Sequence, residues 1–203
     1  MSRNLLIPTN HWTARITASV AAGIVALGIV SADPVTYPLT LAATQKATTI
    51  SEGQIRTILE QMQAASNKRD TKTIMKFLAP NATVLMTIEG MGQSQTMSLT
   101  RSQYYQYLQQ GFYITENYQG SYADLKIQVM PDRKTAIATY VLNEEVTIKS
   151  QPGTIVSSSD ATMKFEIVKD EILVTQIKSR SRLGFKNAFN RVPGMGDGVQ
   201  KNS

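Results

Sequence analysis

The sequence predicts an α+β domain with three helices and an antiparallel sheet, and two features carry this prediction. In the first part of the domain, apolar residues recur with a period near 3.6, as on the buried face of a helix. After residue 111 the period falls to 2, and four extended segments follow one another. The connections between these segments are too short for the crossovers that parallel neighbours require, so the order of elements reads ααββαββββ.

The first helix is predicted over residues 50–66. Thr49 and Glu52 have the spacing of a capping box at its start. Asp70 is placed to cap a second, short helix, which Pro80 would end. The apolar positions of the first helix are Ile55, Ile58, Leu59, Met62 and Ala65, and those of the second are Ile74, Phe77 and Leu78.

A β-hairpin is predicted after the second helix. Two extended runs rich in strand-forming residues occupy residues 83–88 and 94–99. Gly90 and Gly92 lie between these runs and permit a turn.

The third helix is predicted over residues 101–110. Thr100 and Gln103 form a second capping box, and Gly111 has the position of a left-handed cap that ends the helix. The strands of the long sheet then show apolar alternation over residues 123–129, 136–148, 161–167 and 172–178.

The N-terminus has the features of a secretory signal peptide. Arg3 and Arg15 are basic, residues 16–30 form an uncharged apolar run, and small residues precede a predicted cleavage site after Ala32. A periplasmic or secreted protein is therefore expected; the alternative is an uncleaved leader that anchors the domain, the one case in which membrane contact is expected. The predicted boundaries are signal peptide 1–32, linker 33–48, folded domain 49–183 and flexible basic tail 184–203.

Composition excludes several kinds of chemistry. The chain has no cysteine, and its only histidine and tryptophan, His11 and Trp12, lie in the leader. Disulfides, thiol chemistry, a metal site and a cofactor are therefore not expected. Residues 51–177 hold 12 basic and 13 acidic side chains, so nucleic acid is not an expected partner either.

The order of elements and two stretches of sequence resemble the nuclear transport factor 2-like superfamily, which includes the SnoaL-like proteins. These stretches are ILEQMQAASNKRDTKTIMKFLAPNATV at the helical opening and ILVTQIKSRSRL in the last strand, and the resemblance covers residues 50–182. It implies a strongly curved antiparallel sheet wrapped around the three helices, with a cone-shaped cavity lined by the long strands and by the first and third helices. Members include isomerases, cyclases, dehydratases, transport factors and non-catalytic modules, so the resemblance implies a pocket and leaves its chemistry open.

The catalytic candidates lie in the long strand that contains YVLNEEVTIK. Glu144 and Glu145 point to opposite faces of that strand, so only one of them can face the cavity. Tyr140 precedes Glu144 by four residues and shares its face. A desolvated Glu144 would have a raised pKa and could act as a general acid or base. The alternative is an exposed or salt-bridged strand residue, with Tyr140 in the core.

The other pocket candidates are Tyr104 and Tyr107 of the third helix and Arg180 of the last strand. The tyrosines belong to an aromatic cluster that could stack an apolar ligand or simply pack the helix against the sheet. Arg180 could bind an anionic ligand or pair with Glu144, or it could lie in solvent at the strand end.

The predicted function is that of an exported small-molecule-binding or assembly module with a cone-shaped pocket and no catalysis, because the mature chain would lack histidine. Its ligand would be small and either apolar or anionic. The alternative is a cofactor-independent enzyme of isomerase or lyase type that uses Glu144 and Tyr140. A homodimer is also expected, because a second copy would cover the outer face of the sheet and stabilise a small domain without disulfides.

Overall fold

The computed structural model describes residues 46–90, 92–149 and 153–186, and within them the predicted α+β order is confirmed. The expected signal peptide, most of the expected linker and the expected tail after residue 186 lie outside the described residues, as do His11 and Trp12. The elements are α2 (Glu52–Asn67), α3 (Thr71–Lys76), β1 (Leu78–Gly90), β2 (Gln93–Thr100), α4 (Arg101–Ile114), β3 (Thr115–Val129), β4 (Thr135–Ile148), β5 (Thr154–Val168) and β6 (Glu171–Lys186). In these parts of the chain, no helix is long and apolar enough to cross a bilayer.

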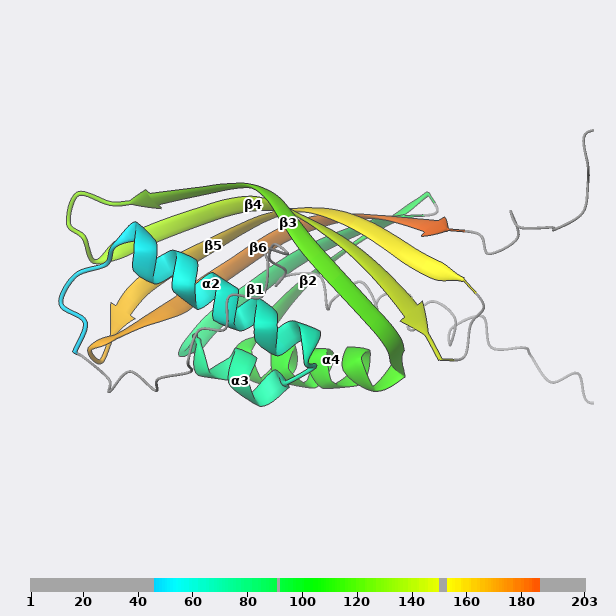
Figure 1. Ribbon diagram of the computed structural model, residues 1–203, viewed down its shortest axis with the longest axis horizontal. Helices are drawn as coiled ribbons and strands as arrows, with labels where there is room; N and C mark the ends of the chain where they lie inside the picture. Colours follow the sequence, from blue (N-terminus) through cyan, green and yellow to red (C-terminus); the bar gives the residue numbers. More distant parts are fainter. Residues whose placement is uncertain (1–45, 91, 150–152, 187–203) are drawn as a thin grey trace, which may run out of the picture.

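The strands form one six-stranded sheet in the order β2-β1-β6-β5-β4-β3, and the three helices lie against one of its faces (Figure 1). The meander β3-β4-β5-β6 is antiparallel, as its short connections predict. The expectation of an antiparallel sheet throughout is wrong at one place, because β1 and β6 pair in parallel. These two strands are far apart in the sequence, so the rule for short connections does not constrain their direction. The sheet is therefore mixed.

Burial alternates along the central strands and identifies the face that the helices cover. On β4 the even-numbered residues from Ala136 to Ile148 are buried, and on β6 the odd-numbered residues Ile177, Ser179 and Ser181 are buried. The core forms between these inward side chains and the helices. Its largest fully buried members are Tyr104, Phe165, Ile50, Ile55, Met62, Ile74, Met86, Leu108, Leu142, Met163 and Ile177.

The first helix begins two residues later than the sequence predicts. Its N-cap is Ser51, whose hydroxyl accepts from the Gln54 backbone while the Gln54 side chain accepts from the Ser51 backbone, so the predicted box at Thr49 is wrong. Ile50 explains the shift, because its side chain is fully buried and its N–H donates to the carbonyl of Arg133 at 2.6 Å. Because Ile50 is held in this position, Ser51 is the N-cap and Glu52 is the first residue of the helix.

We expect Ser51→Ala to lower the free energy of unfolding by about 1 kcal/mol, the usual cost of losing an N-cap hydroxyl. Thr49→Ala should have almost no effect, because Thr49 is exposed and lies outside the helix. Urea unfolding of the two variants measures both values. A larger loss for Thr49→Ala than for Ser51→Ala would contradict this start of the helix.

The third helix continues through Gly111, which was expected to end it. Gly111 is buried inside α4, and Phe112 extends the apolar face of that helix into the core. The helix ends at Ile114, and its C-cap is Thr115, whose side-chain hydroxyl and backbone N–H both donate to the Gly111 carbonyl. The capping box of Thr100 and Gln103 at the other end is confirmed.

Candidate functional site

The structure decides which glutamate of the pair in β4 faces inward. Glu144 lies on the face that the helices cover and is only 2% exposed. Glu145 is exposed on the opposite face, where it forms an ion pair with Lys186. Glu144 is therefore the glutamate that can serve a pocket on the inner face. It shares that face with the buried Tyr140, as expected for residues four positions apart in a strand.

Two hydroxyl groups hold the carboxyl group of Glu144, one from each neighbouring strand. The Tyr118 hydroxyl on β3 donates to Oε1 at 2.8 Å, and the Ser157 hydroxyl on β5 donates to Oε2 at 2.8 Å. Ser157 lies directly opposite Glu144 in the β4–β5 ladder, while Gly120 is its partner on β3. No basic side chain is recorded as a partner of Glu144 among the described residues.

Gly120 makes the contact from Tyr118 possible. A Cβ atom at position 120 would lie 2.8 Å from the Tyr118 hydroxyl oxygen and 3.2 Å from the ring carbon that carries it. Because glycine lacks this atom, the Tyr118 side chain can lie across position 120 and reach the glutamate. The Gly120 carbonyl also accepts from the Gln63 side chain at 3.1 Å, which ties this point of β3 to α2.

Burial raises the pKa of Glu144 to about 8, although the hydrogen bonds from Tyr118 and Ser157 act in the opposite direction. At neutral pH the carboxyl group therefore keeps its proton for most of the time. A protonated carboxyl group can donate one hydrogen bond, so the site offers a donor to a ligand where an ordinary glutamate would offer only acceptors.

Three further tyrosines are buried near this carboxyl group. Burial raises the pKa of Tyr104, Tyr107 and Tyr140, and the charge of Glu144 adds to the shift at each of them. All three side chains therefore stay neutral at physiological pH. The Tyr104 hydroxyl is fully buried and has no hydrogen-bond partner among the described residues, whereas the Tyr140 ring contacts the Tyr122 ring at a centroid distance of 5.9 Å.

A pocket of about 740 Å³ opens beside this group, within the range of small-molecule sites. Tyr118, Glu144 and Ser157 all contribute to its wall. The remaining lining residues are Asn67, Gln119, Gly120, Ser121, Asn143, Glu145, Val156 and Lys186. Within the described part of the chain, no group of three or more histidine, cysteine, aspartate or glutamate side chains is placed to hold a metal ion.

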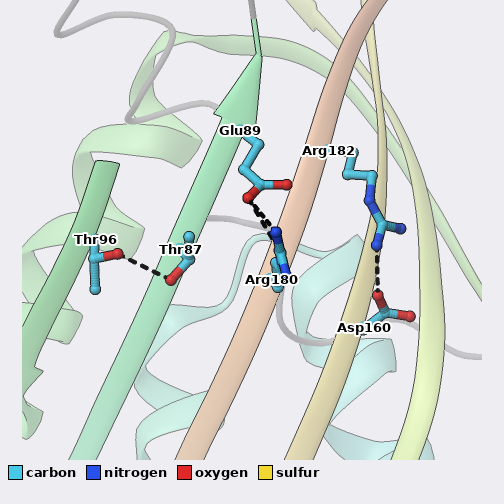
Figure 2. Close-up of polar contacts among 6 residues, drawn as sticks. All are labelled: Thr87, Glu89, Thr96, Asp160, Arg180 and Arg182. Carbon is cyan, nitrogen blue, oxygen red and sulfur yellow. Dashed lines mark hydrogen bonds and ion pairs between the residues drawn. The ribbon is translucent and has the colours of Figure 1, made fainter. Parts of the chain in front are cut away.

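Arg180 is not part of this site, contrary to the sequence-based expectation. Its side chain lies on the outer face of β6, where its guanidinium forms an ion pair with Glu89 at 2.7 Å (Figure 2). Arg182 lies on the same face and pairs with Asp160 at 3.2 Å. The inward positions of this part of β6 belong to serines, so neither arginine can pair with Glu144 or bind an anion inside the cone.

Comparisons with known proteins confirm the fold predicted from the sequence. No family model and no curated protein matches the chain. A nuclear transport factor 2-like protein of unknown function from Pseudomonas putida has a similar structure, with a TM-score of 0.52 and 18% identity over 64% of this chain and 84% of that one.

Two solved structures with functional descriptions are also similar. One is a putative scytalone dehydratase from Novosphingobium aromaticivorans, with a TM-score of 0.53 and 9% identity over 68% of this chain and 91% of that one. The other is the hexachlorocyclohexane dehydrochlorinase LinA-type3 from Novosphingobium barchaimii, with a TM-score of 0.52 and 11% identity over 70% of this chain and 96% of that one. At such identities the likeness establishes the fold alone.

Proposed function

We propose that this chain, which has the nuclear transport factor 2-like fold, binds a small neutral molecule in the pocket beside Glu144. The observation that carries the proposal is the buried carboxyl group held by two hydroxyls in the wall of that pocket. Burying a carboxyl group without a cation lowers the stability of a domain, whereas an apolar side chain there would raise it. Residues that oppose stability in this way are characteristic of functional sites.

The chemistry of the wall indicates the class of ligand. The Tyr118 ring and Val156 supply apolar surface, while the protonated Glu144 supplies a hydrogen-bond donor. An anionic ligand would meet one basic side chain in the wall, Lys186, whose charge is already paired with Glu145, while Arg180 lies on the outer face. The matching ligand is therefore uncharged, with apolar surface for the Tyr118 ring and a carbonyl or hydroxyl oxygen that accepts from Glu144.

A second candidate function is catalysis by proton transfer, in an isomerisation or elimination without a cofactor. The pKa of Glu144, about 8, favours it, because a group that titrates near neutrality can both give and take a proton. Glu144 would then be the catalytic residue and Tyr118 would position it. A dehydratase and a dehydrochlorinase are among the proteins of similar fold, which is consistent with this candidate.

We also propose that the domain works outside the cytoplasm and as a homodimer. The leader sequence supports the first statement. The broad outer face of the sheet, which the three helices leave uncovered, supports the second (Figure 1).

Native mass spectrometry of the full chain, purified from the exported fraction, tests the proposed function. Wild-type protein and Glu60→Leu should retain a small molecule, because Glu60 is exposed on α2 and does not line the pocket. Glu144→Leu, which keeps the volume and removes the donor, should lose it while its circular dichroism spectrum stays unchanged.

The same spectra give the oligomer mass and the processed N-terminus. Chemical change of the retained molecule by the wild type, but not by Glu144→Gln, would favour catalysis over binding. A wild-type protein without any additional mass would contradict tight ligand binding.

A further inference from the structure

We propose that a band of four buried serines, which begins at Ser157 beside Glu144 and continues through Ser159 to Ser181 and Ser179, provides at its far end a second polar subsite for a hydroxyl or carbonyl group of the ligand. This inference rests on the proposed function and specifies its ligand. The four side chains lie on the inner faces of β5 and β6, and each is at most 8% exposed.

The serines continue the polar line that begins at Glu144. Ser157 is opposite Glu144 in the β4–β5 ladder, and Ser159 follows two residues later on the same face of β5. Ser159 is opposite Ser181 in the β5–β6 ladder and donates to its hydroxyl oxygen at 2.9 Å. Ser179 precedes Ser181 by two residues on the same face of β6 and lies opposite the small side chain of Ala161. A diagonal of hydroxyls therefore crosses the sheet.

Part of the hydrogen-bonding capacity of this band is unused. The Ser179 hydroxyl is buried and has no hydrogen-bond partner among the described residues, and the same holds for the Tyr104 hydroxyl. Ser181 accepts from Ser159, which leaves its own hydrogen for another acceptor. Buried hydroxyls without partners are costly, so native proteins satisfy them with water or a ligand. A ligand oxygen that reaches this band would satisfy these groups.

Uncharged groups dominate the surroundings of the band. Among the described residues, the buried polar side chains other than tyrosines are Gln63, Ser66, Thr71, Thr115 and the four serines, with Glu144 as the single carboxyl group. A charged end group would find no opposite charge here and would lose its hydration. The far end of the ligand is therefore a neutral hydroxyl or carbonyl.

The spacing of the two subsites indicates an elongated ligand. Ser181 lies two strands across and two residues along from Glu144 in the ladder register, which corresponds to roughly 12 Å between the backbone positions. The inner side chains that flank this polar line, Leu142 on β4 and Ala161 on β5, are apolar and buried. The ligand is thus a rod-like molecule with an apolar body and an oxygen at each end.

Two rigid probes test this inference by calorimetric titration of the full chain at pH 6, where Glu144 is protonated. One is biphenyl with a para hydroxyl on each ring, and the other is biphenyl with a single para hydroxyl. The first should bind wild-type protein about tenfold more tightly, as one additional buried hydrogen bond predicts. The double variant Ser179→Ala, Ser181→Ala should abolish this difference without changing the affinity for the second probe.

Ser158→Ala is the matched control, because Ser158 is the neighbour on β5 whose side chain points to the outer face. It should leave the affinity for both probes unchanged. Ser179→Ala alone should leave the melting temperature unchanged or raise it, since the hydroxyl that it removes has no protein partner. Such a result separates a role in ligand binding from a role in the fold.

The outcomes separate this inference from the function on which it rests. If both probes bind wild-type protein equally, or if the double variant retains the tenfold preference, the serine subsite is wrong. The proposed function would still stand if the probe with one hydroxyl binds and loses affinity in Glu144→Leu. Failure of both probes to bind wild-type protein would contradict the subsite and the proposed function together.

Discussion

Glu144→Gln is expected to stabilise the domain above pH 8 and to leave its stability almost unchanged at pH 5. The pKa of this carboxyl group is about 8 in the folded protein because of burial, against an ordinary value of 4.5 in the unfolded chain. Between these two values the folded protein holds a proton that the unfolded chain has released. The wild type therefore loses stability as the pH rises through this window.

The size of the effect follows from the difference between the two pKa values. The stabilisation by the retained proton is complete below pH 4.5 and is lost once the pH has passed about 8. The total loss is about 4 to 5 kcal/mol, which corresponds to roughly ten degrees or more in melting temperature for a domain of this size. Glutamine has nearly the same shape and carries no charge at any pH, so the variant should avoid this loss.

Thermal unfolding of the wild type and Glu144→Gln at pH 5, 7 and 9 measures the difference. Glu145→Gln is the matched control, because it makes the same change one residue away on the exposed face. Its pH dependence should follow that of the wild type. Parallel curves for the wild type and Glu144→Gln over the whole range would show that Glu144 is already ionised in the folded protein.

Gly120→Ala is expected to lower the free energy of unfolding by about 2 kcal/mol. The new methyl group would lie 2.8 Å from the Tyr118 hydroxyl oxygen, so the ring must move and its hydrogen bond to Glu144 must lengthen or break. A buried acceptor that loses a partner costs about 1 to 3 kcal/mol, and crowding in a packed interior adds to this cost. The substitution should also weaken ligand binding, because it disturbs the wall of the pocket.

Urea unfolding measures this loss, with Gly53→Ala as the control. A Cβ atom at position 53, on the exposed surface of α2, would meet no other atom within 4 Å. That substitution should stabilise the helix by up to about 1 kcal/mol, because alanine loses less backbone freedom on folding than glycine. Equal stabilisation by both substitutions would mean that Tyr118 does not lie across position 120.

The sequence pattern predicts the architecture because most of the core alternates cleanly. β4 is the clearest case, since its inward positions from Ala136 to Ile148 are nearly all apolar and its predicted extent lies within one residue of the observed strand. β5 shows the limit. It begins at Thr154, seven residues before the predicted start, and its first inward positions include Ser157 and Ser159. Where core positions hold polar residues, the alternation of hydropathy does not reveal the strand.

The candidate site was predicted only in part for the same reason. Glu144, Tyr140, Tyr104 and Tyr107 are buried together, as the shared face and the aromatic cluster suggested. Tyr118 and Ser157, which hold the carboxyl group, were not among the candidates. The register that brings them to Glu144 depends on where β3 and β5 begin and on the length of a turn, and a shift of one residue would exchange the two faces.

The same sensitivity explains the error at Arg180. The alternation of basic residues at the end of β6 correctly predicts that Arg180 and Arg182 share a face, but it does not say which face. Pairing of β6 with β1 and β5 fixes the choice, because it places Ser179 and Ser181 inward. Contacts between distant parts of the chain therefore decided the role of these arginines.

The central claim is that Glu144 is buried as a neutral acid and presents a donor to the pocket. Carbon-13 NMR titration of the glutamate side-chain carboxyl groups tests it most directly, with Glu144→Gln used to assign the signal. We predict one carboxyl carbon that titrates near pH 8 and is missing from the variant. Titration of every glutamate near the ordinary value, below about pH 5.5, would contradict the claim and remove the basis for a neutral ligand.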